Sequence, residues 1–172
     1  MAKLSENATK RNIHTVSLVV ANKPGVLVRI AQVFARRGFN IDSLVVSPTV
    51  DPKFSSMTIT SRGDAATLDQ IIKQSAKLID VIHVSEHKPE EAMEVELALY
   101  KVKGKSVTKV SISKSIKSYQ AQIIDIAQDS IIIQQIGSTE ELDTLEAILK
   151  KYGLVEMVRT GKVVMARGKE ST

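Results

Sequence analysis

The chain has no cysteine and no tryptophan, and it has only three tyrosines and three phenylalanines. The absence of cysteine excludes disulfides, thiolate metal sites and cysteine nucleophiles. Because aromatic residues are scarce, the core must be built from aliphatic side chains, and hydrophobic residues make up 43% of the 172 residues. This length and composition predict one ordinary domain or two small ones with packed cores.

Long apolar runs are also absent. The polar N-terminal residues lack the apolar segment of a secretory signal. No uninterrupted apolar run approaches the roughly 18 residues of a membrane-spanning helix. We therefore expect a cytoplasmic protein without a membrane partner, or a protein of the plastid stroma if the gene is plastid-encoded.

Motifs for catalysis are missing as well. The sequence contains no Gly-x-Gly-x-x-Gly and no P-loop, and His14, His83 and His87 have neither a nearby nucleophile motif nor metal-ligand spacing. The pair Glu90-Glu91 is interpreted as a solvated run, and Glu140-Glu141 as part of a helix start. We predict a non-catalytic chain that holds no metal and no cofactor.

The chain is basic, with a net charge of +5 and a pI near 9.4. A basic chain can bind nucleic acid. Aromatic residues for base stacking are not interleaved with the lysines of the second half, which favours a solvated face over a nucleic-acid interface. Those lysines are Lys101, Lys103, Lys105, Lys109, Lys114 and Lys117.

The first half of the sequence predicts a βαββαβ unit. Its β-branched and alternating stretches predict strands, and its apolar residues at helical spacing predict two helices. This element order is typical of the ferredoxin-like fold, an antiparallel sheet with both helices on one face. The expected strands are 13–20, 40–49, 54–61 and 81–86, and the helices begin at Val26 and after Gly63-Asp64.

The second half repeats this order without repeating the sequence. Its strands are expected at 95–102, 121–127, 130–136, 154–160 and 162–166, and a Ser138/Glu141 capping box predicts a helix up to Gly153. Residues 105–119 are interpreted as a helix or a loop. The predicted fold class is α+β, with tandem ferredoxin-like domains at 12–87 and 95–168 and a linker at 88–94. Such small halves leave sheet edges that favour an oligomer or a partner protein.

A candidate ligand site lies at the two ends of the first helix. The N–H groups that begin this helix lack helical partners and attract an anion, and Gly25 leaves room for it. Asn22 offers a donor and an acceptor, and Asn40 can receive an α-amino group through its side-chain oxygen. Together these residues suit a free amino acid beside Val26 and Ile41. The alternative is that Asn22 and Gly25 are ordinary turn residues.

Two long stretches resemble a known family. The segments "SLVVANKPGVLVRIAQVFARRGFNIDSLVVSPTVDPKFSSMTIT" and "LEAILKKYGLVEMVRTGKVVMARG" resemble the small regulatory subunit of acetolactate synthase, with its N-terminal ACT domain. The resemblance covers about residues 12–168. It departs from the family pattern at Tyr119-Gln120-Ala121 and Ile136-Gly137, and in a Ser/Lys-rich stretch that precedes them. These departures bear on the contacts that the second domain makes with the catalytic subunit.

The resemblance implies a regulatory role. Such a subunit has no catalysis of its own and binds a large catalytic subunit that uses thiamine diphosphate, Mg²⁺ and FAD. It raises the activity of that subunit and confers feedback inhibition by valine, in branched-chain amino-acid biosynthesis. ACT domains pair as a homodimer, and the effector lies at the interface. Asn22, Gly25 and Val26 match the effector loop of the family, and Asn40 and Ile41 match the segment that faces it from the other copy.

Two alternatives remain open at this stage. The chain could be an ACT-type amino-acid sensor of a different enzyme, which would change the partner only. It could also be a free-standing RNA-binding βαββαβ protein, which the basic pI favours. The absence of an aromatic-rich strand of the Lys-Gly-Phe-Gly-Phe kind counts against that second alternative.

Overall fold

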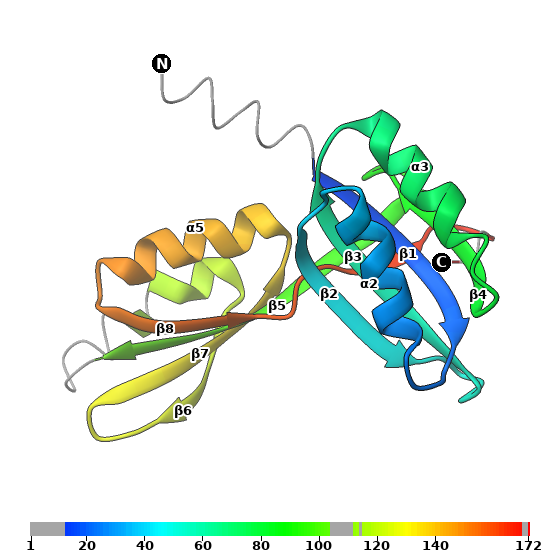
Figure 1. The fold of residues 1–172 in the computed structure, drawn as a ribbon. Helices are drawn as coiled ribbons and strands as arrows, with labels where there is room; N and C mark the ends of the chain where they lie inside the picture. The colour runs from blue at the N-terminus through cyan, green and yellow to red at the C-terminus, as the bar shows by residue number, and fades with distance from the viewer. Residues whose placement is uncertain (1–12, 104–111, 114, 170–171) are drawn as a thin grey trace, which may run out of the picture. The chain divides into compact units, whose positions relative to one another are not determined.

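The computed structural model describes residues 13–103, 112–113, 115–169 and 172 (Figure 1). They form two compact units. Unit 1 contains the first part of the chain up to Glu94 together with the segment that begins at Lys162, and unit 2 runs from Val95 to Gly161. Each unit has its own core and is described separately.

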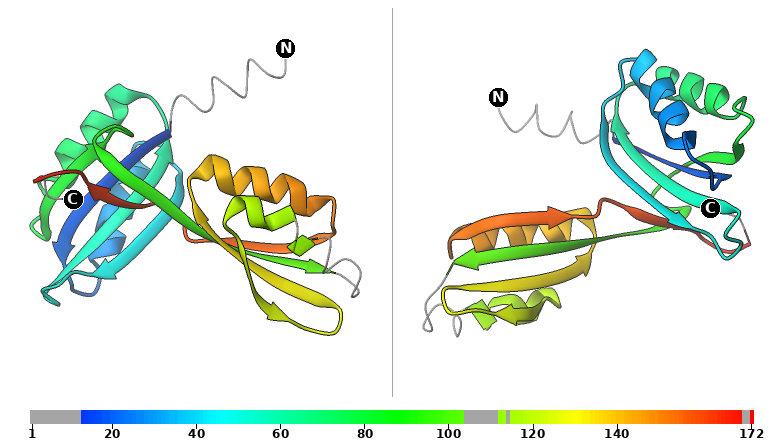
Figure 2. Two further views of the ribbon diagram at one scale, coloured as in Figure 1. Left: turned by 180° about the vertical axis from the view of Figure 1, so that it is seen from behind. Right: turned by 60° about the horizontal axis from the view of Figure 1, so that its bottom comes forward.

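Unit 1 has the predicted βαββαβ order, and the expected α+β fold is confirmed. Its sheet has the strand order β2-β3-β1-β4, and every pairing along it is antiparallel. The two helices cover one face of this sheet, as the views in Figure 2 show. The elements are β1 (Ile13–Ala21), α2 (Val26–Arg36), β2 (Ile41–Pro48), β3 (Phe54–Arg62), α3 (Ala65–Ser75) and β4 (Val81–His87).

The core of unit 1 is aliphatic, as the composition predicts. It joins alternate residues of β1 and β3 to the apolar stripe of α2, which consists of Val26, Ile30, Val33 and Phe34. Leu27, which the periodicity also assigns to that stripe, is 41% exposed and lies off the core face. The stripe fixes the rotation of α2 on the sheet and so fixes where its first turn points.

Unit 2 repeats the architecture. The sheet order β6-β7-β5-β8 is the same path as in unit 1, and α5 packs over one face. Residues 112–113 and 115–116 are helical and lead into η1 (Lys117–Tyr119). The described part of the stretch 105–119 is therefore a helix and not a loop. The other elements are β5 (Ala92–Lys103), β6 (Gln122–Ile126), β7 (Ser130–Gly137), α5 (Thr139–Lys150) and β8 (Leu154–Arg159).

The unit boundaries lie near the expected linker but not at its ends. β5 begins at Ala92, inside the stretch 88–94, and its first residues belong to unit 1. β9 (Val163–Ala166) pairs with β5 and also belongs to unit 1. An ion pair of 2.5 Å between Lys162 Nζ and Glu94 Oε2 joins these two segments. The last strand therefore returns to the first unit.

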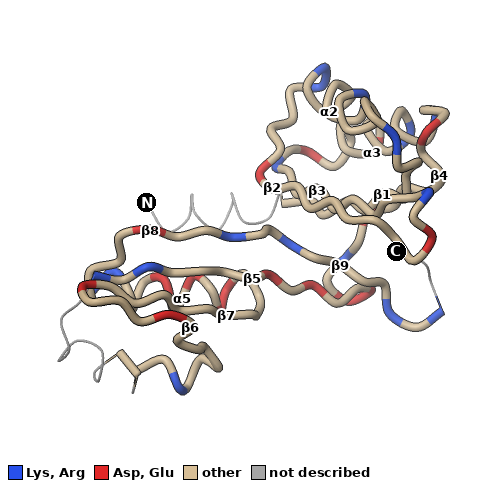
Figure 3. The backbone as a smooth tube through the Cα atoms, turned by 90° about the horizontal axis from the view of Figure 1, so that it is seen from below, with Lys and Arg blue, Asp and Glu red and all other residues tan. Residues whose placement is uncertain are grey.

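The lysines of the second half are only partly described. Lys101 forms an ion pair of 3.0 Å with Glu156 across neighbouring strands. Figure 3 shows Lys and Arg positions interspersed with Asp and Glu along the described chain. Lys105, Lys109 and Lys114, where a basic face was considered, lie outside the described residues, as does much of the stretch 105–119.

Candidate functional site

The first turn of α2 has no internal cap. The helix begins at Val26 after Gly25, which adopts a left-handed backbone with φ of 83°. No side chain caps this end by a hydrogen bond, and the first turn contains no acidic residue. A helix start of this kind presents N–H groups and the positive end of the helix dipole. The turn is therefore suited to an anion such as a carboxylate.

The other helices begin differently. Asp64 caps α3 by accepting hydrogen bonds from the backbone N–H of Thr67 at 2.8 Å and from the Thr67 hydroxyl at 2.7 Å. These bonds hold the pKa of the Asp64 carboxyl below its usual value, because they stabilise the ionised form. Ser138 and Glu141 form the predicted capping box at α5. Among these three helices, α2 alone lacks a side-chain cap.

Arg29 adds a second positive charge beside Gly25. Its Nη1 lies 3.3 Å from the position that a Cβ at residue 25 would occupy. Its Nη2 donates to Asp80 Oδ2 at 2.5 Å, and this contact fixes the guanidinium. Arg29 was not among the residues that the sequence predicted for this site. The signal was its spacing of four residues from Gly25, which brings its side chain back over the helix start.

Asn22 is tied to a neighbouring turn. Its backbone N–H donates to the carbonyl of Lys53 at 2.8 Å, and its Nδ2 donates to the carbonyl of Pro52 at 3.0 Å. The amide donor that was expected to serve a ligand is thus used within the chain. Its Oδ1 has no hydrogen-bond partner among the residues that the structure describes. Asn22 therefore keeps one acceptor while it anchors the loop.

The side chains of Val26 and Ile41, which were expected to line the site, pack toward the core of unit 1. The side chain of Val26 is buried in the core of unit 1, with 3% of the residue exposed. Ile41 is partly buried and packs against the same core. The backbone N–H of Val26 lies at the start of the helix and donates a long hydrogen bond of 3.5 Å to the carbonyl of Lys23. A ligand at this turn would meet the backbone of Val26 and not its side chain.

Asn40 lies beyond the other end of α2. Its Nδ2 donates to Asp42 Oδ1 at 3.1 Å, and Asp42 forms an ion pair of 2.9 Å with Arg62. Asn40 is exposed, and the carboxylate of Asp42 beside it was not singled out from the sequence. The 11 residues of α2 span about 16 Å at 1.5 Å per residue. One chain therefore does not bring Asn40 together with Asn22 and Gly25.

Two of the three histidines, His14 and His87, are held by hydrogen bonds within unit 1. His14 contacts Glu86 at 2.8 Å and the carbonyl of Gly63 at 3.1 Å, and the Ser17 hydroxyl lies 2.5 Å from His87 Nε2. Within the described ranges, no group of three or more His, Asp or Glu residues is arranged to hold a metal. No helix in that same part of the chain is long and apolar enough to cross a membrane.

The fold and the first turn of α2 define the class of protein. Residues 16–83, which lie in the βαββαβ unit, match the family described as the AHAS small subunit-like ACT domain. The family described as the small subunit of acetolactate synthase matches residues 95–168. The protein is therefore an ACT-domain protein whose second unit matches a family model of its own.

Comparison with individual proteins gives the family. The chain is 42% identical over 155 residues to a probable acetolactate synthase small subunit of Archaeoglobus fulgidus, covering 90% of this chain and 97% of the relative. It is 39% identical to the acetolactate synthase small subunit of Mycolicibacterium smegmatis, covering 90% and 91%. The chain belongs to the acetolactate synthase small-subunit family.

A solved structure supports the same assignment. The crystal structure of the acetolactate synthase small subunit from Thermotoga maritima superposes with a TM-score of 0.83 at 36% identity. The match covers 92% of this chain and 99% of that chain. Both units are therefore part of the likeness.

Proposed function

We propose that this chain is a regulatory subunit that binds the catalytic subunit of acetolactate synthase, raises its activity and makes it sensitive to valine. Family membership supports the partner. The observation that carries the effector site is the first turn of α2, which has no internal cap and lies beside the Arg29 guanidinium. This turn attracts the carboxylate of an amino acid.

The two ends of α2 would serve two halves of one ligand. The valine carboxylate accepts hydrogen bonds from the backbone N–H groups of the turn at Gly25 and Val26. The ammonium group binds the Oδ1 of Asn40, close to the Asp42 carboxylate. Because these ends are about 16 Å apart in one chain, a complete site needs Asn40 and Ile41 from a second copy. We therefore include a homodimer through unit 1 in the proposal.

Valine would act through a coupling free energy. It binds more tightly to one arrangement of the paired units than to another, and the favoured arrangement lowers the activity of the catalytic subunit. This chain contributes the effector site and the contact with its partner. The thiamine diphosphate, Mg²⁺ and FAD chemistry would belong to the catalytic subunit.

Reconstitution tests this function directly. Acetolactate formation by the cognate catalytic subunit is measured with and without the full chain, over a range of valine concentrations. We expect the chain to raise the rate and valine to reverse that rise. If the rate of the catalytic subunit is the same with and without the chain at every valine concentration, the proposal is wrong.

A further inference from the structure

A cavity lies in unit 2, far along the chain from the proposed effector residues. It has a volume of about 340 Å³. Gln120 borders it beyond η1, Gln135 comes from β7, and Glu140 and Thr144 come from the first turns of α5. We call it the α5 cavity. Its size falls at the lower end of the range of small-molecule sites, which is roughly 300–1,000 Å³.

Gln135 is a buried polar side chain with an unused acceptor. Only 2% of the residue is exposed, and its Nε2 donates to the carbonyl of Tyr119 at 3.2 Å. Its Oε1 has no hydrogen-bond partner among the described residues. A buried acceptor without a donor costs free energy, and most such groups in proteins are paired. Gln135 is also one of the residues that line the α5 cavity.

The charges that line the α5 cavity are negative. Glu140 and Glu141 are the only charged lining residues within the described part of the chain, although the whole chain carries a net charge of +5. Glu141 is occupied by the capping box, in which its Oε2 accepts the backbone N–H of Ser138 at 2.8 Å. The carboxylate of Glu140 has no ion-pair partner within the described ranges. The cavity therefore combines a free carboxylate with a buried, unpaired amide oxygen.

We propose that the α5 cavity binds a small organic cation with N–H donors, of the guanidinium class. A planar guanidinium carries five N–H donors and no acceptor, so one group can serve both Gln135 Oε1 and the Glu140 carboxylate. An anion would meet the two carboxylates, and an apolar molecule would leave the Gln135 acceptor unpaired. The described lining residues of this site all belong to unit 2, whereas the proposed valine site uses residues of unit 1.

Nuclear magnetic resonance on the full chain tests the proposal with methylguanidinium as the probe. We expect saturable shifts of the Gln135 side-chain amide and of the Gln120 backbone amide. Tetramethylammonium has the same charge but no N–H donors, so it should cause no saturable shift at these signals. Saturable binding of methylguanidinium alone supports the site. Equal responses to the two cations, or no saturable response to methylguanidinium, overturn it.

Two variants locate the binding. Glu140→Gln removes the free charge at constant size, and we expect methylguanidinium to bind at least about tenfold more weakly, as for loss of a charge-assisted hydrogen bond. Glu156→Gln changes an exposed carboxylate outside the cavity and should leave the affinity unchanged. Both substitutions are at exposed positions, so the fold should persist. Unchanged affinity in Glu140→Gln contradicts the proposal.

Discussion

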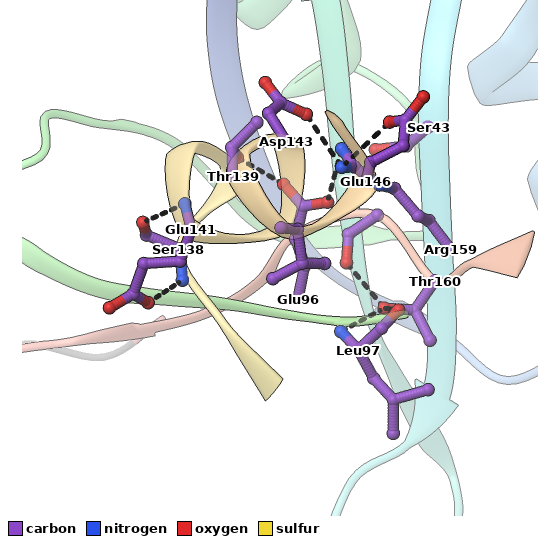
Figure 4. A network of polar contacts seen from close by, with 12 residues as sticks. Ser43, Glu96, Leu97, Ser138, Thr139, Glu141, Asp143, Glu146, Arg159 and Thr160 are labelled. Atoms are coloured by element: carbon purple, nitrogen blue, oxygen red, sulfur yellow. Dashed lines mark hydrogen bonds and ion pairs between the residues drawn. The ribbon is translucent and has the colours of Figure 1, made fainter. Parts of the chain in front are cut away.

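The first turns of α2 and α5, one helix from each unit, solve the same problem in opposite ways. Every helix leaves its first N–H groups without helical partners. In α5 the chain supplies the partners, because Ser138 and Glu141 bond to each other's backbone (Figure 4). In α2 the chain supplies Gly25 and no acceptor side chain. One helix start is thus complete by itself, and the other is open to a partner from outside.

The largest effect should come from closing the open helix start. In Gly25→Asp a carboxylate would lie beside the Arg29 guanidinium and the free N–H groups, in the place proposed for the valine carboxylate. We expect the reconstituted enzyme to lose inhibition by valine. Acetolactate formation against valine concentration measures this, and an inhibition curve like that of the unsubstituted chain would remove Gly25 from the site.

A matched control separates occupancy from backbone strain. Gly38, at the other end of α2, also has a positive φ of 72°, with open space around its Cβ position. Gly38→Asp should therefore carry a similar conformational cost of about 1–2 kcal/mol. It places no carboxylate at the first turn, so inhibition by valine should persist. Loss of inhibition in both variants would mean that strain, and not occupancy, explains the first result.

The next prediction concerns the ion pairs that Arg159 forms within unit 2. Arg159 lies 2.7 Å from Asp143 and 4.0 Å from Glu96, whose side chain is 7% exposed (Figure 4). Arg159→Met would leave the Glu96 carboxylate without its cation. We expect α5 and β8 to lose about 2 kcal/mol of stability, less than for a fully buried pair because Arg159 is 20% exposed. Hydrogen exchange of α5 amides measures this loss.

The control for that prediction is an exposed ion pair in the same sheet. Lys101 and Glu156 are 43% and 59% exposed at the side chain, so their pair should contribute little. Lys101→Met should change the exchange of α5 amides by less than about 0.5 kcal/mol. If the two variants have equal effects, the partly buried network is not what stabilises the helix in unit 2.

Local sequence patterns predicted most of the fold but only part of the site. Alternating strands, helical stripes and the Ser138 capping box depend on residues close in sequence, and they appear as expected apart from Leu27, which lies off the core face of α2. The contact of Asn22 with Pro52 and of Arg29 with Asp80 joins residues far apart in sequence, which no local pattern encodes. The return of β9 to unit 1 was missed for the same reason.

The far end of α2 gives a smaller, graded test of the open helix. Asn40→Ala removes the amide oxygen that we propose binds the valine ammonium group, while the exposed position should tolerate alanine. We expect valine to bind about tenfold more weakly, as for loss of one hydrogen bond to a charged group. Calorimetry on the full chain measures the affinity, with Gln128→Ala in an exposed turn of unit 2 as the control. Unchanged affinity in Asn40→Ala would remove this residue from the site.

Removing the Ser138 cap should lower the stability of the first turn of α5 and have no other effect. Ser138→Ala removes the side chain that accepts the Glu141 N–H, and we expect the first turn of α5 to lose about 1 kcal/mol. Ser138→Asp keeps a good capping acceptor and should retain most of that stability. Hydrogen exchange of the first-turn amides distinguishes the two. If Ser138→Ala and Ser138→Asp exchange alike, the cap has no measurable value at α5.

The smallest effect concerns the first turn of α3. This helix also belongs to unit 1, no ligand is expected at its start, and Asp64 caps it. The Thr67 bonds depress the pKa of Asp64 in the folded state. Their contribution is thus present above the unfolded pKa, near 4, and is lost as the pH falls through the lower folded pKa. Asp64→Asn keeps a capping oxygen without titrating, so exchange of the first-turn amides of α3 should depend less on acid pH. The same acid profile in both proteins would mean that the Asp64 charge does not stabilise this turn. A flatter acid profile in Asp64→Asn would show that the Asp64 charge stabilises α3, in contrast to α2, which has no side-chain cap.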